Sequence, residues 1–399
     1  VARFLQYAAT TTVAGTAQGR LGPLSEPAAS ATQQTCRKPV TVLYVINDLA
    51  VGGAQRVLAG LINHLDRSRF HPLVLNLGFA AGHEIEKELQ RSGITVIRNK
   101  AIVIGDLTSI YTVYACIKKY RAGIVHSHLF WSNLFAAIAC RWLRVAPVFS
   151  SEHNTSTFVT RPWWYRTLSR LYLRLNSGSF AVSQAVAQAI ARLQPATAHK
   201  VQVVYNGIDR RIFAPERYKT SGVKHSNSDR FTVGTLVRQD PRKGFDIFVA
   251  IAAQVASGIE CVAGYRGLPL SNAGQVRWRA MNDGEEGTAQ FLATLDLFVL
   301  PSREEGLGLV VLEAMAMGVA VVASDVGGLR EIITSERNGL LVPVGDVRGF
   351  VQAIERLRTD QALRERCIAH ALADVRSRFD IIHMAATMQA YYEAALCRR

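Results

Sequence analysis

The sequence lacks a hydrophobic run long enough to span a bilayer. The closest candidate, residues 133–151, is interrupted by Arg141, Arg144 and Pro147, whereas a transmembrane helix needs about 20 consecutive apolar residues. Paired cysteines are also missing, because the six cysteines lie far apart in the chain. Neither a zinc site nor a redox dithiol is therefore predicted, and scattered thiols favour a reducing cytoplasm. No Asp-x-Asp pair occurs, and no metal site is predicted.

Length and composition predict a globular protein with two domains. The chain has 399 residues, of which 49% are hydrophobic and 19% charged, and this length exceeds what one hydrophobic core usually supports. Residues 1–38 differ from the rest, since Glu26 is their only acidic residue and they show no periodicity. They are predicted to form a disordered tail. They have no sustained apolar core for a secretory signal, although an acid-poor leader with arginine resembles an organelle transit segment.

From residue 40 onward, strand and helix patterns alternate, which predicts an α/β fold. A first series of apolar runs predicts strands at 40–47, 71–77, 94–97, 123–126, 147–151, 179–182 and 201–204. After a polar stretch at 206–230, a second series predicts strands at 231–236, 260–263, 276–280, 296–300, 319–323 and 340–343. We therefore expect two Rossmann-like doubly wound domains, at 39–205 and 206–379, that face each other across a ligand-binding cleft.

The most informative motif, at 301–318, places two carboxylates around a Gly-x-Gly turn that leads into an apolar helix. Glu305 precedes Gly306 and Gly308, and Glu313 lies inside the helix. The first helical turn offers free N–H groups to an anion. Amides beside two carboxylates suit a ligand with phosphate and hydroxyls, such as a nucleotide sugar. In the alternative interpretation Glu305 caps the helix and Glu313 is solvated, which the apolar neighbours of Glu313 disfavour.

Two further loops each follow the first predicted strand of a domain, at the carboxyl edge of its sheet. Arg238 and Lys243 lie between a strand and a helix, where they are placed to hold a diphosphate, the first bidentately and the second as a point charge. An ordinary solvated basic loop is the alternative. In the first half, Gly52 and Gly53 stand between a strand and a helix, an incomplete nucleotide-binding fingerprint that is equally compatible with a tight turn.

Three histidines lie at or near strand ends. His126 is predicted to be structural and to point away from His128. His128 ends its strand on the cleft side and is the predicted functional residue. For His153, at the end of the next strand, a place in the acceptor site and a purely structural role remain open.

Taken in order, these motifs resemble the retaining glycosyltransferases of family 4 (glycosyltransferase group 1), which have the GT-B fold. The resemblance rests on the spacing of Glu305 and Glu313, on Arg238 with Lys243, and on segments 52–57, 126–128, 151–154, 181–183, 205–209, 301–302 and 324–328. Two departures are the leucine at 307, where an aromatic residue is usual, and the short segment 264–275, which leaves the nucleobase open.

The resemblance implies a role for each matching residue. Arg238 and Lys243 would bind the donor diphosphate, and Glu313 the ribose hydroxyls. Glu305 and the turn would bind the donor sugar and phosphate. The donor-binding set is Gly53, Arg238, Lys243, Glu305, Gly306, Leu307, Gly308, Leu309 and Glu313. His128 would face the anomeric centre, and a final helix near 380–396, within the C-terminal segment 380–399, would return to the N-terminal domain.

The chemistry that follows is hexosyl transfer without a metal or a cofactor. Arg238, Lys243 and the helix N-terminus would stabilise the leaving diphosphate. Retention by front-face attack is implied by the resemblance alone. A catalytically silent nucleotide-sugar-binding subunit is the alternative from another class, and an enzyme resembling glycogen phosphorylase is disfavoured because no lysine for pyridoxal phosphate is evident.

Charge is distributed unevenly between the two halves. Residues 40–205 hold 18 Lys and Arg against 7 Asp and Glu, a balance of +11, whereas 206–399 hold 24 against 23. Trp163, Trp164 and the arginines at 166, 170 and 174 are arranged as in interfacial helices. A glycan or lipid-linked acceptor at an anionic membrane surface, on the cytoplasmic side, is therefore predicted. An equally open alternative is that this helix simply covers the sheet and that its arginines form its solvent-exposed face. No nucleic-acid recognition motif accompanies the charge.

Overall fold

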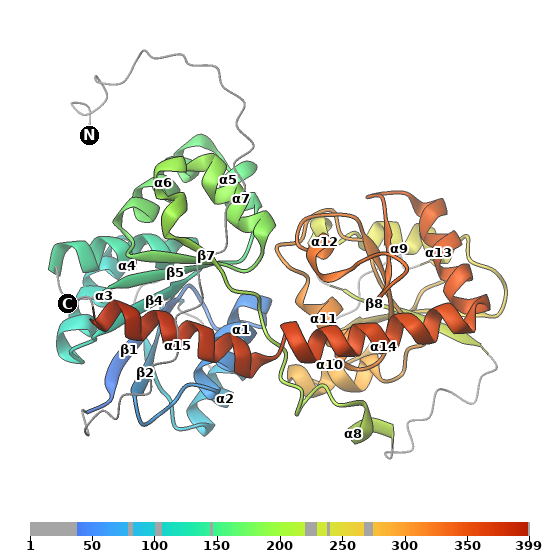
Figure 1. The fold of residues 1–399 in the computed structure, drawn as a ribbon, viewed down its shortest axis with the longest axis horizontal. Coiled ribbons are helices and arrows are strands. Elements are labelled where there is room, and N and C mark those ends of the chain that lie inside the picture. The colour runs from blue at the N-terminus through green and yellow to red at the C-terminus, as the bar shows by residue number, and fades with distance from the viewer. Residues whose placement is uncertain are drawn as a thin grey trace, which may run out of the picture. The chain divides into compact units, whose positions relative to one another are not determined.

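The computed structural model describes residues 38–78, 83–99, 106–143, 147–219, 230–237, 240–266 and 274–397. Two parallel sheets and their covering helices form one compact unit that begins at Pro39 (Figure 1). The predicted tail, apart from Lys38, lies outside the described residues.

The first sheet contains seven described strands in the order β3-β2-β1-β4-β5-β6-β7. These strands are β1 (Val40–Ile46), β2 (Phe70–Asn76), β3 (Thr95–Arg98), β4 (Ile124–His128), β5 (Val148–Glu152), β6 (Gly178–Ala181) and β7 (Val201–Val203). The helices in this part of the chain are α1 (Gly53–Asn63), α2 (Glu84–Arg91), α3 (Thr108–Lys119), α4 (Phe130–Leu143), α5 (Ser156–Val159), α6 (Trp163–Leu175), α7 (Gln184–Leu193) and the 3-10 helix η1 (Pro195–Lys200). Because side chains alternate along a strand, β1 supplies Leu43 and Val45 to one core and Val42, Tyr44 and Ile46 to another. Both faces of this sheet are therefore buried.

The second sheet contains six described strands in the order β10-β9-β8-β11-β12-β13. These strands are β8 (Phe231–Leu236), β9 (Ile259–Tyr265), β10 (Arg277–Ala280), β11 (Leu297–Leu300), β12 (Ala320–Ser324) and β13 (Leu340–Val342). Its helices are α8 (Pro215–Lys219), the 3-10 helix η2 (Pro241–Lys243), α9 (Phe245–Ala252), α10 (Gly284–Leu292), α11 (Leu309–Ala316), α12 (Leu329–Ile332), α13 (Val347–Thr359) and α14 (Gln361–Arg378).

The predicted fold class is confirmed. Every predicted strand is present, with limits within two residues of those expected, and the strands of each sheet pair in parallel. The boundaries proposed at 205/206 and 379/380 stay predictions.

The strand order of each sheet fixes where a ligand can bind. Consecutive strands extend from β1 in one direction and from β4 in the other, and the same reversal occurs between β8 and β11. In doubly wound sheets, ligands bind outside the carboxyl ends of the strands at such a reversal. His128 ends β4, and Gly53, Lys243 and Glu305 lie in the segments that follow β1, β8 and β11. The fold therefore brings these four predicted residues to the two places where binding is expected.

The final helix α15 (Ile381–Cys397) packs on the first sheet (Figure 1). It contacts α1 and buries Met384, Met388 and Tyr392 in the core on that face. The chain segment that enters this helix runs beside the linker between the sheets, since Ile208 forms a β-bridge with Asp380. The final helix thus completes the core on this face of the first sheet.

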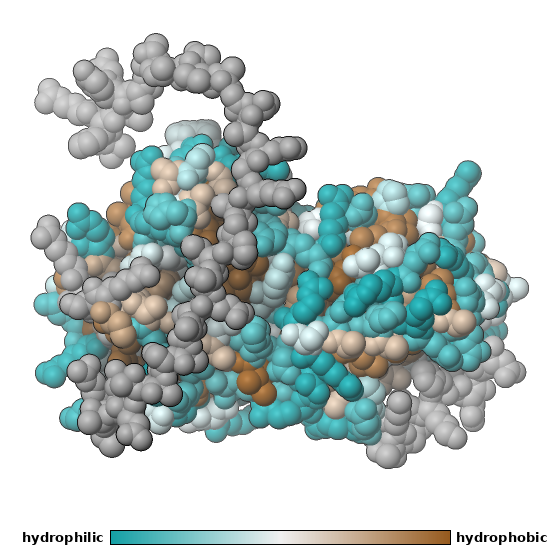
Figure 2. All heavy atoms as spheres, in the orientation of Figure 1, coloured by the Kyte–Doolittle hydropathy of each residue, from teal (hydrophilic) through white to brown (hydrophobic). Residues whose placement is uncertain are grey.

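Hydrophilic side chains cover most of the described surface that is visible in Figure 2, and hydrophobic residues form smaller patches. No helix in the described ranges is long and apolar enough to cross a membrane. Among the described cysteines none forms a disulfide; four are buried and Cys397 is exposed.

Candidate functional site

A cavity of about 700 Å³ is lined by segments at the carboxyl edges of both sheets. This volume is within the range of small-molecule sites. The first sheet contributes Gly53, Arg56 and His153, among others. The residues from the second sheet include Lys243, Tyr265, Arg266, Trp278, Glu305, Gly306, Leu307, Gly308, Leu309 and Glu313. The fold thus gathers most of the predicted donor-binding residues around one space.

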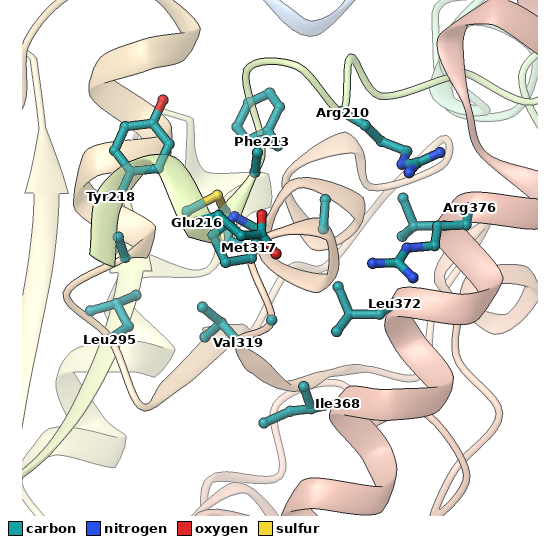
Figure 3. Close-up of a pocket in the computed structure, with 16 residues that line it drawn as sticks. Arg210, Phe213, Glu216, Tyr218, Leu295, Met317, Val319, Ile368, Leu372 and Arg376 are labelled. Carbon is teal, nitrogen blue, oxygen red and sulfur yellow. The ribbon is translucent and has the colours of Figure 1, made fainter. Parts of the chain in front are cut away.

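A second cavity, of about 570 Å³, lies at the opposite edge of the second sheet. Leu295 and Val319, which line it, come just before β11 and β12 and therefore mark the amino edge. Figure 3 shows its mainly apolar wall, with Arg210 and Arg376 extending from two different segments. None of the predicted site residues that the structure describes lines this cavity, so the cleft between the carboxyl edges is the candidate site.

The turn before α11 needs glycine at two positions. Gly308, the N-cap residue of α11, has a φ of +97°, in the left-handed region. A Cβ on Gly306 would lie 2.0 Å from the carbonyl oxygen of His153 in the first domain. Within the described part of the chain no side-chain cap is found at the start of α11, which leaves its first N–H groups without the side-chain partner that would compete with an anion.

Glu305 does not cap this helix. Its side chain is buried, and Oε1 accepts hydrogen bonds from Nζ of Lys243, at 2.7 Å, and from Oγ of Ser302, at 2.8 Å. Lys243 ends the short helix η2, whose start is capped by Asp240 through its bond from the Arg242 N–H. Lys243 therefore faces the cavity with a carboxylate beside it. Arg238, the second predicted diphosphate ligand, lies outside the described residues.

Glu313 is not a solvated helix residue. It is 2% exposed, and its Oε1 lies 3.2 Å from Nη1 of Arg56 on α1. The other terminal nitrogen of Arg56 is 3.3 Å from the hydroxyl of Thr288, which also accepts a 2.8 Å bond from Arg266. Burial and the nearby Arg56 lower the pKa of Arg266.

Sequence reasoning assigned no role to Arg56 or Arg266. Arg56 follows Gly53 by three residues and therefore shares its helix face, a signal that was available. Arg266 directly follows β9, and its partners Asn282, Gly284 and Thr288 lie at and before the first turns of α10, so the pattern around Arg266 alone gives no sign of them.

The prediction that His126 points away from His128 was wrong. Their ring centroids lie 4.5 Å apart, because residues two apart in a strand share a face. The predicted structural role of His126 is confirmed, since its ring nitrogens bond to the hydroxyls of Ser151, at 2.8 Å, and Tyr392. Tyr392 belongs to α15, so the final helix fixes this histidine.

His128 lies behind His153. Its Nδ1 is 3.1 Å from Nε2 of His153, it is fully buried, and its Nε2 has no hydrogen-bond partner among the described residues. His153, in contrast, lines the cavity. Burial and the two neighbouring histidines hold the pKa of His128 well below its usual value, and burial lowers the pKa of His153 to about 4. Both rings are therefore neutral at pH 7, and the role of His128 at the anomeric centre stays a prediction.

A buried carboxylate stands next to His153 in the chain. Glu152 ends β5 and accepts hydrogen bonds from Nδ2 of Asn133, at 2.9 Å, and from the Tyr172 hydroxyl, at 3.1 Å. Burial raises its pKa to about 7 against the opposing effect of these bonds. Sequence reasoning gave this residue no role.

Gly53 begins α1 and lines the cavity. Apart from its two chain neighbours and the backbone of its own helix, no heavy atom of the described residues lies within 4 Å of where its Cβ would stand. The backbone at this position is thus open to close approach, as the predicted phosphate contact requires.

Comparisons with known proteins point to one family. Residues 51–211 match the model described as Glycosyltransferase Family 4, and residues 229–360 match Glycosyl transferases group 1. The lipopolysaccharide core biosynthesis mannosyltransferase LpsB of Rhizobium meliloti is 32% identical over 213 residues, which are 49% of this chain and 61% of that protein. A D-inositol 3-phosphate glycosyltransferase of Stackebrandtia nassauensis is 31% identical over 306 residues, which are 69% of each.

Solved structures share the fold. The crystal structure of HepE from Anabaena, in complex with UDP and glucose, matches with a TM-score of 0.74 and 21% identity, covering 89% of this chain and all of that one. At this identity the likeness concerns the fold alone. Together with the two family matches and the relatives, it shows that the chain belongs to the group 1 glycosyltransferases of family 4, with the GT-B fold.

Proposed function

We propose that the protein transfers a hexose from a nucleotide-diphosphate sugar to a glycan or lipid-linked acceptor, with retention of configuration and without a metal or a cofactor. The observation that carries this proposal is the convergence of Lys243, Glu305, Glu313 and the Gly306–Gly308 turn on one cavity. Amides and a cation suit the diphosphate, and two carboxylates suit the hydroxyls of ribose and sugar.

The donor would lie along the second domain. Glu313 would accept hydrogen bonds from the ribose, and the amides of the turn would meet the diphosphate together with Lys243 and Arg238. Glu305, beside Lys243, would meet the donor sugar. The UDP and glucose in the HepE structure support a nucleotide-sugar donor, but the nucleobase is left open.

Charge development explains how these groups would accelerate the reaction. Cleavage of the sugar–phosphate bond builds negative charge on the leaving oxygen, where fixed cations and amides stabilise it without reorganisation. The diphosphate needs no proton from a protein acid in order to leave, so Glu305 and Glu313 are not an acid and base pair as in glycosidases. The leaving phosphate would accept the proton of the attacking hydroxyl.

The acceptor would enter beside the first domain. His153 lines the cavity there as a neutral group and can exchange hydrogen bonds with a hydroxyl. LpsB is a lipopolysaccharide core enzyme by its name, which supports a lipid-linked or polysaccharide acceptor.

We propose that the first domain meets an anionic membrane surface, through charge and exposed aromatic residues. Trp163 is 78% exposed and Trp164 is 42% exposed at the start of α6. The arginines of α6 are less available to a membrane surface than the sequence suggested, since Arg170 donates to the Leu193 carbonyl oxygen at 3.2 Å and Arg166 is half-buried. The tryptophans are therefore the better residues for a test.

A silent nucleotide-sugar-binding subunit is the competing function, and donor turnover separates the two. The melting temperature of the purified protein should rise with one of the UDP-, GDP- or ADP-sugars. The protein should also hydrolyse that donor slowly without acceptor and release the nucleotide. Binding without any turnover, in the presence of candidate glycan acceptors, would favour the silent subunit.

A further inference from the structure

A carboxylate of the second domain occupies a helix terminus of the first. Oε2 of Glu331, on α12, accepts a 2.8 Å hydrogen bond from the N–H of Gln184, and Oε1 accepts a 2.8 Å bond from the N–H of Ala185. These two residues begin α7. Glu331 thus binds α7 bidentately from more than 140 residues away in the sequence.

The contact satisfies the electrostatic requirement of α7. The first N–H groups of a helix have no partner within it and carry partial positive charge. Here Glu331 takes the first two, and the side chain of Ser183 accepts from Val186 at 3.2 Å. The Tyr205 hydroxyl adds a 3.0 Å bond to Oε2 of Glu331. Burial and this carboxylate raise the pKa of Tyr205 to about 12, so the phenol stays a neutral donor.

The same region is tied to the turn that we assign to the donor. Oγ of Ser183 donates to the carbonyl oxygen of Gly306 at 2.6 Å, and the N–H of Gly328, just before α12, donates to the carbonyl oxygen of Glu305 at 3.2 Å. A Cβ on Gly328 would lie 2.2 Å from the Gly306 oxygen. The loop before α12 and the turn are therefore in close contact, and displacement of one requires displacement of the other.

A neighbouring carboxylate makes a second contact of this kind. Oε1 of Glu304, next to Glu305, accepts from the Thr155 hydroxyl at 2.9 Å, in the loop after β5, and from the Ser156 N–H at 2.7 Å, at the start of α5. This loop contains His153. Both sides of the donor turn are consequently fastened to segments of the first domain.

We propose that Glu331 is a positioning residue. By accepting hydrogen bonds from the Gln184 and Ala185 N–H groups it acts as a latch, which holds the first domain against the donor turn, Gly306–Gly308. The inference rests on the proposed function for its consequence in catalysis, and on geometry alone for the latch. The latch holds the acceptor side against the turn that carries the donor, so that the attacking hydroxyl and the anomeric carbon meet in a fixed geometry.

Hydrogen exchange tests the latch without any substrate. Peptides that span 180–193 should exchange at least about tenfold faster at Gln184 and Ala185 in Glu331→Ala than in wild type, with Glu331→Gln between them. Glu336→Gln is the matched control, because it removes a carboxylate of the second domain that pairs with Arg356. Unchanged exchange in Glu331→Ala would overturn the proposal.

Kinetics test the positioning role. Glu331→Gln should lower kcat for transfer about tenfold, which is about 1.4 kcal/mol, while nucleoside diphosphate binding and melting temperature stay close to wild type. Tyr205→Phe, which removes one donor to Glu331, should give a smaller loss. Faster exchange with unchanged kcat would refute positioning. If wild type turned over no donor, the proposed function would fail, and the exchange comparison would still decide the latch.

Discussion

Glu152 should make the stability of the protein depend on pH in the neutral range. The residue is 3% exposed, its carboxyl is fixed by Asn133 and Tyr172, and burial raises the pKa of this carboxyl from 4.5 to about 7. The folded protein therefore holds this proton more tightly than the unfolded chain does. Glu152→Gln keeps the shape of the side chain and removes the titration.

The sign and size of the effect follow from this difference. Between pH 4.5 and 7 the folded state binds more protons at this site, so its contribution to the free energy of unfolding is highest below pH 4.5 and falls as the pH rises toward 7. With about 1.36 kcal/mol for each pKa unit, the loss amounts to about 3 kcal/mol at most. Above pH 7 the contribution is constant.

Urea unfolding of wild type and variant at intervals from pH 5 to 8 measures this loss. The stability of Glu152→Gln relative to wild type should rise by about 2–3 kcal/mol across the range. Glu336→Gln is the control, since Arg356 lowers the pKa of Glu336; its contribution is present above the ordinary pKa and is lost only in acid. Parallel profiles for wild type and Glu152→Gln would refute the reasoning.

Three further predictions concern ligands. Lys243→Ala should lose about ten- to a hundredfold in donor turnover, the value of one charge-assisted hydrogen bond, and wild-type kinetics would remove Lys243 from the diphosphate site. Glu313→Gln should weaken binding of both nucleoside diphosphate and donor, whereas Glu305→Gln should lower turnover with little effect on the diphosphate; equal losses by calorimetry would contradict this division. Alanine at both Trp163 and Trp164 should weaken co-sedimentation with anionic vesicles about tenfold, because losing even about 60 Å² of buried apolar area costs about 1.5 kcal/mol, and binding equal to wild type would leave α6 as sheet cover.

The strands could be predicted because their apolar runs are short, regularly spaced and bounded by polar segments. The burial of Glu313 could also be predicted from the sequence, since its neighbours are apolar almost all round the helix. Local patterns of this kind report which residues a segment buries, but they do not report what the segment is buried against.

Contacts between distant segments were not predictable for that reason. The Arg56–Glu313 pair joins residues 257 positions apart, and nothing in either segment alone specifies the other. The same holds for Glu331 and α7. The place of His128 behind His153 depends on how β4 and β5 align, because the register pairs His128 with Ser151 and leaves His153 beyond it at the cavity wall.

Titration calorimetry with nucleotide sugars tests the central claim, that this cleft binds a nucleotide-diphosphate sugar through the second domain. Wild type should bind one of the UDP-, GDP- or ADP-sugars, and Glu313→Gln should bind the same compound at least tenfold more weakly, since a charge-assisted hydrogen bond contributes about 1.5–3 kcal/mol. Absence of binding by wild type, or equal affinity in both proteins, would contradict the account.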